Sequence, residues 1–189
     1  MTLERSRETT GTEQHLSQRE RERFDECVLP YLDAAYNLAR YLLRDGHEAE
    51  EAVQEAFLRA IRYFSGFRGV DGRAWLLSIV RNTCFTQSRR RRAGGERVEF
   101  DEATHSLEEG LSAPEADLAR SIAAASLQEG LGQLTTEFRE VLVLRELEGL
   151  SYKEIAHVIG VPIGTVMSRL ARGRKQLLVA LEAGARERV

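Results

Sequence analysis

The stretch Ser151–Leu178, SYKEIAHVIGVPIGTVMSRLARGRKQLL, decides the fold, because its pattern predicts two helices around a tight turn. Ser151 and Glu154 have the spacing of a capping box, in which the hydroxyl and the carboxylate each bond a backbone amide of the first turn. Gly160 can adopt the left-handed conformation that ends the first helix. Pro162 suits the start of the second helix. This arrangement is typical of a helix-turn-helix that reads duplex DNA.

The second helix of this stretch has an apolar face and a basic face. The residues expected to face the core recur at intervals of three or four: Val166, Leu170, Leu177, Leu178 and Leu181. The opposite side consists of Thr165, Ser168, Arg169 and Arg172, and arginine there can bond guanine edges or phosphates. An ordinary helical hairpin with a solvated face has the same periodicity. The charge favours DNA binding, because residues 164–181 hold four cations and no acid in a chain of net charge −3.

Length and composition predict two small helical domains. A chain of 189 residues with 42% hydrophobic residues can build two modest cores. The alternating apolar pattern of strands is missing, so we expect an all-α protein. The sequence shows no apolar run of bilayer-spanning length and no signal core, which predicts a cytoplasmic protein without membrane insertion. Cys27 and Cys84 lack metal-ligand spacing, so neither a metal nor another cofactor is expected.

The first domain is expected at residues 20–92, after a mobile polar arm at residues 1–19. The core face of its clearest helix, residues 47–63, is predicted to consist of Ala52, Val53, Ala56, Phe57, Ala60 and Ile61. The outward side carries Glu51, Gln54, Glu55 and Leu58. Two interpretations of this side are open: a solvated surface with one scattered leucine, or a surface on which another protein docks.

A second basic cluster lies at the end of the next predicted helix, residues 73–88. Residues 81–92 contain five arginines and no acid, more cations than a helix C-terminus requires, so we infer phosphate binding. The aromatic residues around this helix are Tyr63, Phe64, Phe67, Trp75 and Phe85. Such rings can stack on unpaired bases. Core packing is the more common role of aromatic residues, and we expect it for most of these.

The composition becomes acidic between the two basic clusters. Residues 93–118 contain eight acids and one arginine, which predicts a flexible acidic linker. The charge also allows this segment to fold back on a basic face and suppress DNA binding. The second domain is expected at residues 119–183, followed by a tail at residues 184–189. The residues expected to form the core face of its first helix are Ile122, Leu127, Leu131 and Leu134.

Catalysis is not expected of this chain. His47 and Glu48 begin like a zinc-protease pattern, but Glu51 stands where the second histidine is required. The glycine-rich loop at residues 65–73 has no preceding strand and no Lys-Ser/Thr pair to cradle a phosphate. The sequence therefore favours a binding protein over an enzyme.

Three blocks in order resemble bacterial sigma factors of the extracytoplasmic-function group, within the sigma-70 family. They are AEEAVQEAFLRAIRYF at residues 49–64, GRAWLLSIVRNTCFTQSRRRR at residues 72–92 and LTTEFREVLVLRELEGLSYKEIAHVIGVPIGTVMSRLARGRKQL at residues 134–177. The resemblance covers both predicted domains, as sigma regions 2 and 4. It implies a transcription initiation factor that binds core RNA polymerase, recognises minus-thirty-five and minus-ten promoter elements, and assists melting. An anti-sigma factor is a further candidate partner.

The resemblance also implies a role for particular residues. Contact with the clamp helices of the large polymerase subunit falls on Glu51, Gln54, Glu55 and Leu58. Minus-ten recognition, with capture of the melted single strand, falls on Phe64, Phe67, Arg68, Arg81, Asn82, Arg89, Arg90, Arg91 and Arg92. Minus-thirty-five recognition in the major groove of the duplex falls on Thr165, Ser168, Arg169, Arg172, Arg174 and Lys175. Trp75 is assigned to the core.

The chain departs from the family pattern at two places. Thr86 and Gln87 stand where an acidic residue is usual, and Met167 stands where lysine is frequent, which removes one cation from the second helix of the helix-turn-helix. The main alternative function is a helix-turn-helix regulator that binds operators alone. Such a regulator would bind duplex DNA without polymerase, whereas the sigma-factor interpretation predicts weak DNA binding by the chain alone.

Overall fold

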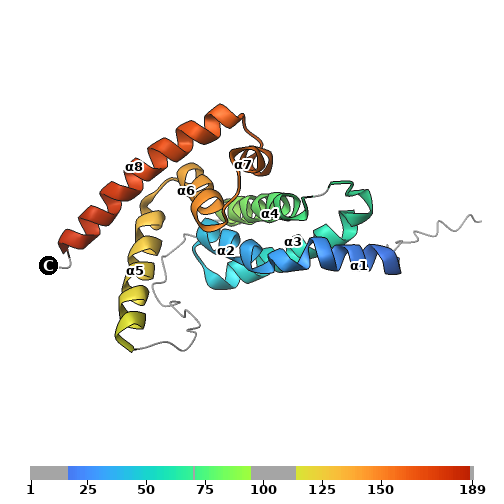
Figure 1. Ribbon diagram of the computed structural model, residues 1–189, viewed down its shortest axis with the longest axis horizontal. Helices are drawn as coiled ribbons and strands as arrows, with labels where there is room; N and C mark the ends of the chain where they lie inside the picture. The colour runs from blue at the N-terminus through green and yellow to red at the C-terminus, as the bar shows by residue number, and fades with distance from the viewer. Residues whose placement is uncertain (1–16, 70, 95–113, 188–189) are drawn as a thin grey trace, which may run out of the picture.

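The computed structural model describes residues 17–69, 71–94 and 114–187, and every regular element in these ranges is helical (Figure 1). The all-α prediction is therefore confirmed. The α-helices are α1 Gln18–Cys27, α2 Leu32–Leu43, α3 Gly46–Tyr63, α4 Gly72–Gly94, α5 Pro114–Gln133, α6 Thr136–Leu142, α7 Tyr152–Ile159 and α8 Ile163–Glu187. Short 3-10 turns, Leu29–Tyr31 and Phe64–Gly66, follow α1 and α3, and a π-helical turn, Val143–Leu147, follows α6.

Helices α1–α4 form the first helical group, whose centre is a ridge of alanines on α3. The fully buried residues of this ridge are Ala49, Ala52, Ala56 and Ala60. Their small side chains let α2 and α4 pack closely against α3. The predicted core face is correct for the alanines, and Val53 and Phe57 are partly buried beside them. Ile61 is 37% exposed, which corrects its predicted core position, because it continues the flanking row of Val53 and Phe57 at the last turn.

Helices α5–α8 form the second helical group, in which α8 packs against α5, α6 and α7. Val166 and Leu170 of α8 are buried as predicted. The prediction for Leu178 is wrong, because the Leu178 side chain is 57% exposed. Successive residues of an α-helix point about 100° apart, so Leu178 faces away from Leu177. Ala180 is buried on the inward side instead. Ile122 is also exposed, because the first half of α5 extends beyond the helices it packs against (Figure 1).

The helix boundaries differ from the predicted domain limits at three places. α1 begins at Gln18, where Ser17 and Glu20 form a capping box that the sequence analysis did not use. α5 begins at Pro114, so residues 114–118, predicted as linker, are helical. α8 continues to Glu187, so most of the predicted tail is also helical. The predicted arm and the rest of the predicted linker lie at residues 1–16 and 95–113, outside the described residues.

The two helical groups touch, with α4 against α7 and α2 against α6. Arg139 of α6 lies at this junction and is 6% exposed. Its guanidinium donates hydrogen bonds to the carbonyl oxygens of Leu131, Gly132 and Leu134 at the end of α5, and to that of Tyr41 in α2. Burial lowers the pKa of Arg139 to about 10, so the side chain stays charged at neutral pH. Four carbonyl oxygens therefore hold α5, α6 and α2 together around one cation.

Candidate nucleic-acid and protein interfaces

The outward surface of α3 carries the four residues predicted to dock a protein. Glu51 and Gln54 are exposed, and Leu58 is 65% exposed. Glu55 is partly buried and forms an ion pair with Arg59, one turn further along the helix. The alanine ridge fixes the opposite side of α3 in the core. The structure therefore places these four side chains together on one rigid, outward-facing helix surface.

The apolar part of this surface is larger than the sequence analysis indicated. Ile61 lies three residues after Leu58, so it is a neighbour of Leu58 on the helix surface, and it is partly exposed. Tyr63, at the end of α3, is 62% exposed. The three-residue spacing from Leu58 indicates this neighbourhood, whereas the spacing of Ile61 from Phe57 predicts a core position. Apolar side chains beside carboxylates suit a protein partner.

An aromatic cluster lies between the end of α3 and the start of α4. The Phe64 ring packs edge-on against Phe24 at 5.1 Å and Trp75 at 6.0 Å between centroids, and Phe67 lies 4.7 Å from Trp75. Arg23 of α1 lies over the Phe64 and Phe67 rings and donates a hydrogen bond to the Phe67 carbonyl oxygen at 3.0 Å. The rings thus fix the loop that precedes α4.

Both aromatic residues predicted to contact DNA in this cluster are buried. Phe64 is fully buried, so it supports the loop from inside and has no exposed ring for a base. Phe67 is 7% exposed. Arg68 is exposed, and its guanidinium donates a hydrogen bond to the Ser65 carbonyl oxygen at 2.9 Å. Trp75 is partly buried against the core, in agreement with its predicted role.

α4 starts against the backbone of α1. A Cβ atom at Gly72 would lie 1.9 Å from the carbonyl oxygen of Cys27, so only glycine fits there. Asp71 then accepts a hydrogen bond from the Ala74 amide at 3.0 Å, which caps the first turn. α4 extends to Gly94, beyond the predicted end at Ser88, and includes the whole run of four arginines.

The predicted minus-ten residues of α4 fall into two sets. Asn82 and three arginines near the end of the helix are exposed to solvent: Arg89, Arg90 and Arg92. Arg91 is partly buried and pairs with Glu48 of α3. Arg81 lies at the interface between the two helical groups, where it pairs with Glu140 of α6. The predicted minus-ten residues on α4 therefore lie along one helix, with Arg81 engaged by the second helical group.

The helix-turn-helix has the local structure that the sequence predicts. Ser151 N donates to a Glu154 carboxylate oxygen at 2.6 Å, and Glu154 N donates to the Ser151 hydroxyl at 3.3 Å. These bonds from Ser151 lower the pKa of Glu154. Gly160 ends α7 with φ 69°, a left-handed conformation that favours glycine. Pro162 immediately precedes α8. The turn thus sets α8 at a defined angle to α7.

Side chains on the outward part of α8 differ in how tightly they are held. Arg172 and Lys175 are exposed, and Met167 is 53% exposed. Ser168 is exposed and donates to the Thr165 carbonyl oxygen at 3.0 Å. Arg174 donates two hydrogen bonds to Glu146, at 2.7 and 3.0 Å, and Arg169 forms ion pairs with Glu137 and Glu140. The structure brings all six predicted α8 residues to one helix, with two of the arginines paired to acids.

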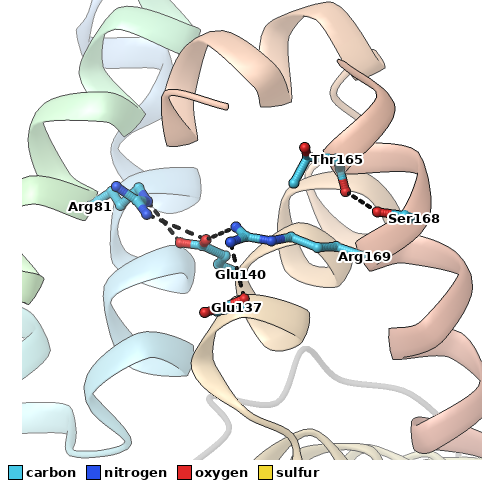
Figure 2. A network of polar contacts seen from close by, with 6 residues as sticks. All are labelled: Arg81, Glu137, Glu140, Thr165, Ser168 and Arg169. Carbon is cyan, nitrogen blue, oxygen red and sulfur yellow. Dashed lines mark hydrogen bonds and ion pairs between the residues drawn. The ribbon is translucent and has the colours of Figure 1, made fainter. Parts of the chain in front are cut away.

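Glu140 is the residue at this site that the sequence analysis missed. Its carboxylate is buried between α4 and α8, where Arg81 and Arg169 approach it from opposite sides (Figure 2). Burial raises the pKa of Glu140, although the two arginines oppose this shift. The partner on α4 could not be found from spacing, since it lies 59 residues away along the chain.

In the part of the chain that the structure describes, no helix is long and apolar enough to cross a membrane. The same residues include no group of three or more His, Cys, Asp and Glu side chains placed to hold a metal ion.

The fold consists of two helical parts, and each presents a helix with exposed arginines. The model of sigma-70 region 2 matches residues 27–94, and that of sigma-70 region 4 matches residues 124–177. The chain therefore belongs to the sigma-70 family, in the extracytoplasmic-function group, and is an alternative sigma factor that directs RNA polymerase to promoters.

Comparisons with individual proteins agree with this assignment. The RNA polymerase sigma-H factor of Pseudomonas aeruginosa is 37% identical over 172 residues, which cover 87% of this chain and 89% of that protein. The factor SigE of Mycolicibacterium smegmatis is 38% identical over 155 residues, 82% of this chain and 60% of that protein. The sigma factor RpoE of Bartonella quintana, solved in complex with the anti-sigma factor NepR, superposes with a TM-score of 0.70 at 28% identity, covering 85% of this chain and 98% of that one.

Proposed function

We propose that the first helical group binds core RNA polymerase through the outward surface of α3. The observation that supports this is the exposed Leu58 surrounded by Glu51, Gln54 and Glu55 on a helix whose other side is fixed in the core. An apolar anchor within a polar rim is the usual composition of a protein-docking surface. The proposed contact on the polymerase is the clamp helices of its large subunit.

We also propose that the two basic helices bind different parts of a promoter. The exposed cations near the end of α4 would neutralise the single strand at the minus-ten element, together with Asn82 and Arg68, which are also exposed. The exposed cations of α8 would enter the major groove at the minus-thirty-five element. Among them, Arg172 would contact a base edge. Attachment of both to one polymerase raises the effective concentration of each at its element.

The same proposal covers the cellular context. The chain acts inside the cell as a non-catalytic subunit, and an anti-sigma factor is a candidate regulator, since the RpoE structure with TM-score 0.70 contains one. The decisive experiment is reconstitution with core polymerase, followed by run-off transcription on a library of genomic fragments. Specific initiation that needs the added chain is the expected result. The same transcripts from core enzyme alone would overturn the proposal.

The docking surface is tested by Leu58→Ala combined with Glu51→Arg. We expect the double variant to lose about 2 kcal/mol or more of core-polymerase affinity, because it removes the apolar anchor and reverses a charge at its rim. Binding is measured by co-purification and by fluorescence titration. Leu178→Ala is the matched control, since Leu178 is a comparably exposed leucine on α8. Equal affinity of the double variant and the control would remove the α3 assignment.

The major-groove assignment is tested by Arg172→Ala against Arg186→Ala, since both arginines are exposed and belong to α8. A base contact at Arg172 should make its loss cost about 1 to 3 kcal/mol in promoter use, measured from promoter-dependent initiation rates. Arg186→Ala should leave these rates unchanged. An equal loss on promoters with altered upstream sequences would assign Arg172 to phosphate contact instead of base reading.

A further inference from the structure

The first turns of α8 present an apolar surface to solvent. Ile163 is 40% exposed and Met167 is 53% exposed. The two side chains are four residues apart on one helix, so they are neighbours on its surface. Val166 and Leu170, by contrast, are buried within the second helical group. The inner side of α8 is thus already packed, and the exposed apolar pair is available to a binding partner.

Polar side chains in this part of α8 are engaged within the chain. The Ser168 hydroxyl donates to the Thr165 carbonyl oxygen at 3.0 Å. Arg169 is the only cation in the first nine residues of α8, and it points to the buried carboxylate of Glu140 (Figure 2). The exposed cations of α8 begin further along the helix, at Arg172. The start of α8 therefore offers mainly apolar atoms to a partner, and the positive charge follows.

Gly164 keeps the same surface open. A Cβ atom at this position would meet no other atom of the described residues within 4 Å. The glycines with positive φ in the described residues are Gly149 and Gly160, so the backbone at Gly164 does not require glycine either. Glycine is also less favourable than alanine in a helix. A missing side chain at an open position suits the close approach of another molecule to the backbone.

The position of α8 in the helix-turn-helix identifies what meets this surface. In such a motif the N-terminal residues of the second helix contact base edges in the major groove. The apolar group that a base pair presents in the major groove is the C5-methyl group of thymine. The methionine side chain is flexible and adapts to irregular apolar surfaces. The cations that follow on α8 complement the phosphates on either side of the groove.

We infer that Met167 is a specificity-determining residue, which selects thymine in the upstream promoter element by packing against its C5-methyl group. Ile163 supports the contact from the preceding turn, and Gly164 lets the start of α8 approach the groove. The inference rests on the proposed role of α8 in minus-thirty-five binding. It adds an apolar contact to the base contact proposed for Arg172, so one helix reads the duplex by two kinds of chemistry.

Replacement of thymine by deoxyuridine tests the contact, because it removes one methyl group and leaves the base pair and the phosphates unchanged. Each thymine of the minus-thirty-five element, on either strand, is replaced in turn in a promoter found by run-off transcription. Initiation rates are measured with limiting holoenzyme, formed from the full chain and core polymerase. We expect one or more replacements to lower the rate about four-fold, the equivalent of about 0.8 kcal/mol for one buried methyl group.

Variants at position 167 assign the effect to its side chain. Met167→Ala should remove the difference between thymine and deoxyuridine, because the shortened side chain no longer reaches the methyl group. Met167→Leu should retain most of the difference, because leucine is apolar and similar in volume. Leu178→Ala is the matched control, since Leu178 is a comparably exposed residue about three turns further along α8, and it should keep the full difference. Circular dichroism checks that each variant keeps its helicity.

Two results would overturn the inference. One is equal rates on every thymine and deoxyuridine template, or an upstream element without thymine on either strand, because no methyl group would then be read. The other is a preference for thymine that persists in Met167→Ala, because a different residue would then contact the methyl group. Failure of the proposed function is distinguishable, since the wild-type chain would then give no initiation even on the unmodified promoter.

Discussion

The two helical groups hold their basic helices by different means. In the first group α4 is positioned by apolar contacts, with the alanine ridge of α3 along it and the rings around Phe64 at its start. In the second group the outward arginines of α8 are positioned by acids, with Arg169 on Glu137 and Glu140. The cations near the end of α4 are thus left exposed, whereas Arg169 of α8 is held in place by its ion pairs. Under the proposed function, the first set would meet a flexible single strand and α8 would meet a duplex.

The largest expected effect tests the apolar support of α4. Phe64→Ala should lower the free energy of unfolding by about 3 to 5 kcal/mol, because it leaves a cavity among Phe24, Phe67 and Trp75. Tyr63→Ala is the control, since that ring is 62% exposed and its removal should change stability little. Urea denaturation measures both. Similar stability of the two variants would contradict an apolar anchor at Phe64.

An intermediate effect tests the ionic support of α8. Arg169→Ala should lower the free energy of unfolding by about 1 to 3 kcal/mol, because the buried carboxylate of Glu140 loses one of its partners. Arg172→Ala should leave stability unchanged, since Arg172 is exposed on the same helix. Equal melting curves for the two variants would show that the ion pairs of Arg169 do not hold α8 in place.

The smallest effect tests the start of the helix-turn-helix. Ser151→Ala should cost about 1 kcal/mol of stability at neutral pH, because the first turn of α7 loses its cap. Bonds from Ser151 lower the pKa of Glu154 below its ordinary value of 4.5, so the ionised carboxylate contributes stability above that pH and loses it as the pH falls further.

The difference between wild type and Ser151→Ala should therefore shrink in acid, which denaturation curves at several pH values can measure. Ser168→Ala is the control, since Ser168 is exposed and within α8. A difference in stability that stays constant through the acid range would show that Glu154 takes no part in the cap.

Local signals predicted the fold well. Ser151, Glu154 and Gly160 act within one or two turns of the chain, and their roles follow from helix geometry. Helical spacing also found the alanines of α3. It failed for Ile61 and Leu178, because spacing defines a face to within one residue and the edge of that face depends on where the neighbouring helix ends.

The candidate site was predicted only as far as single helices allow. The outward placement of Leu58 and Arg172 follows from the pattern of one helix, and the structure agrees with it. The pairing of Arg81 with Glu140 depends on how the two groups pack, and nothing in the sequence around Glu140 distinguishes it from a solvated acid. Phe64 illustrates the same limit, since an aromatic residue beside a loop can face either the core or a base.

The close approach at Gly72 has a consequence for natural variation. Because the start of α4 touches the backbone of α1 at Cys27, any side chain at position 72 must push the two helices apart. Related chains with a larger residue there should carry a compensating shift of α1. The size of the residue at position 72 should therefore vary with the distance between α1 and α4. A survey of natural sequences can test this by comparing position 72 with the residues of α1 that face it.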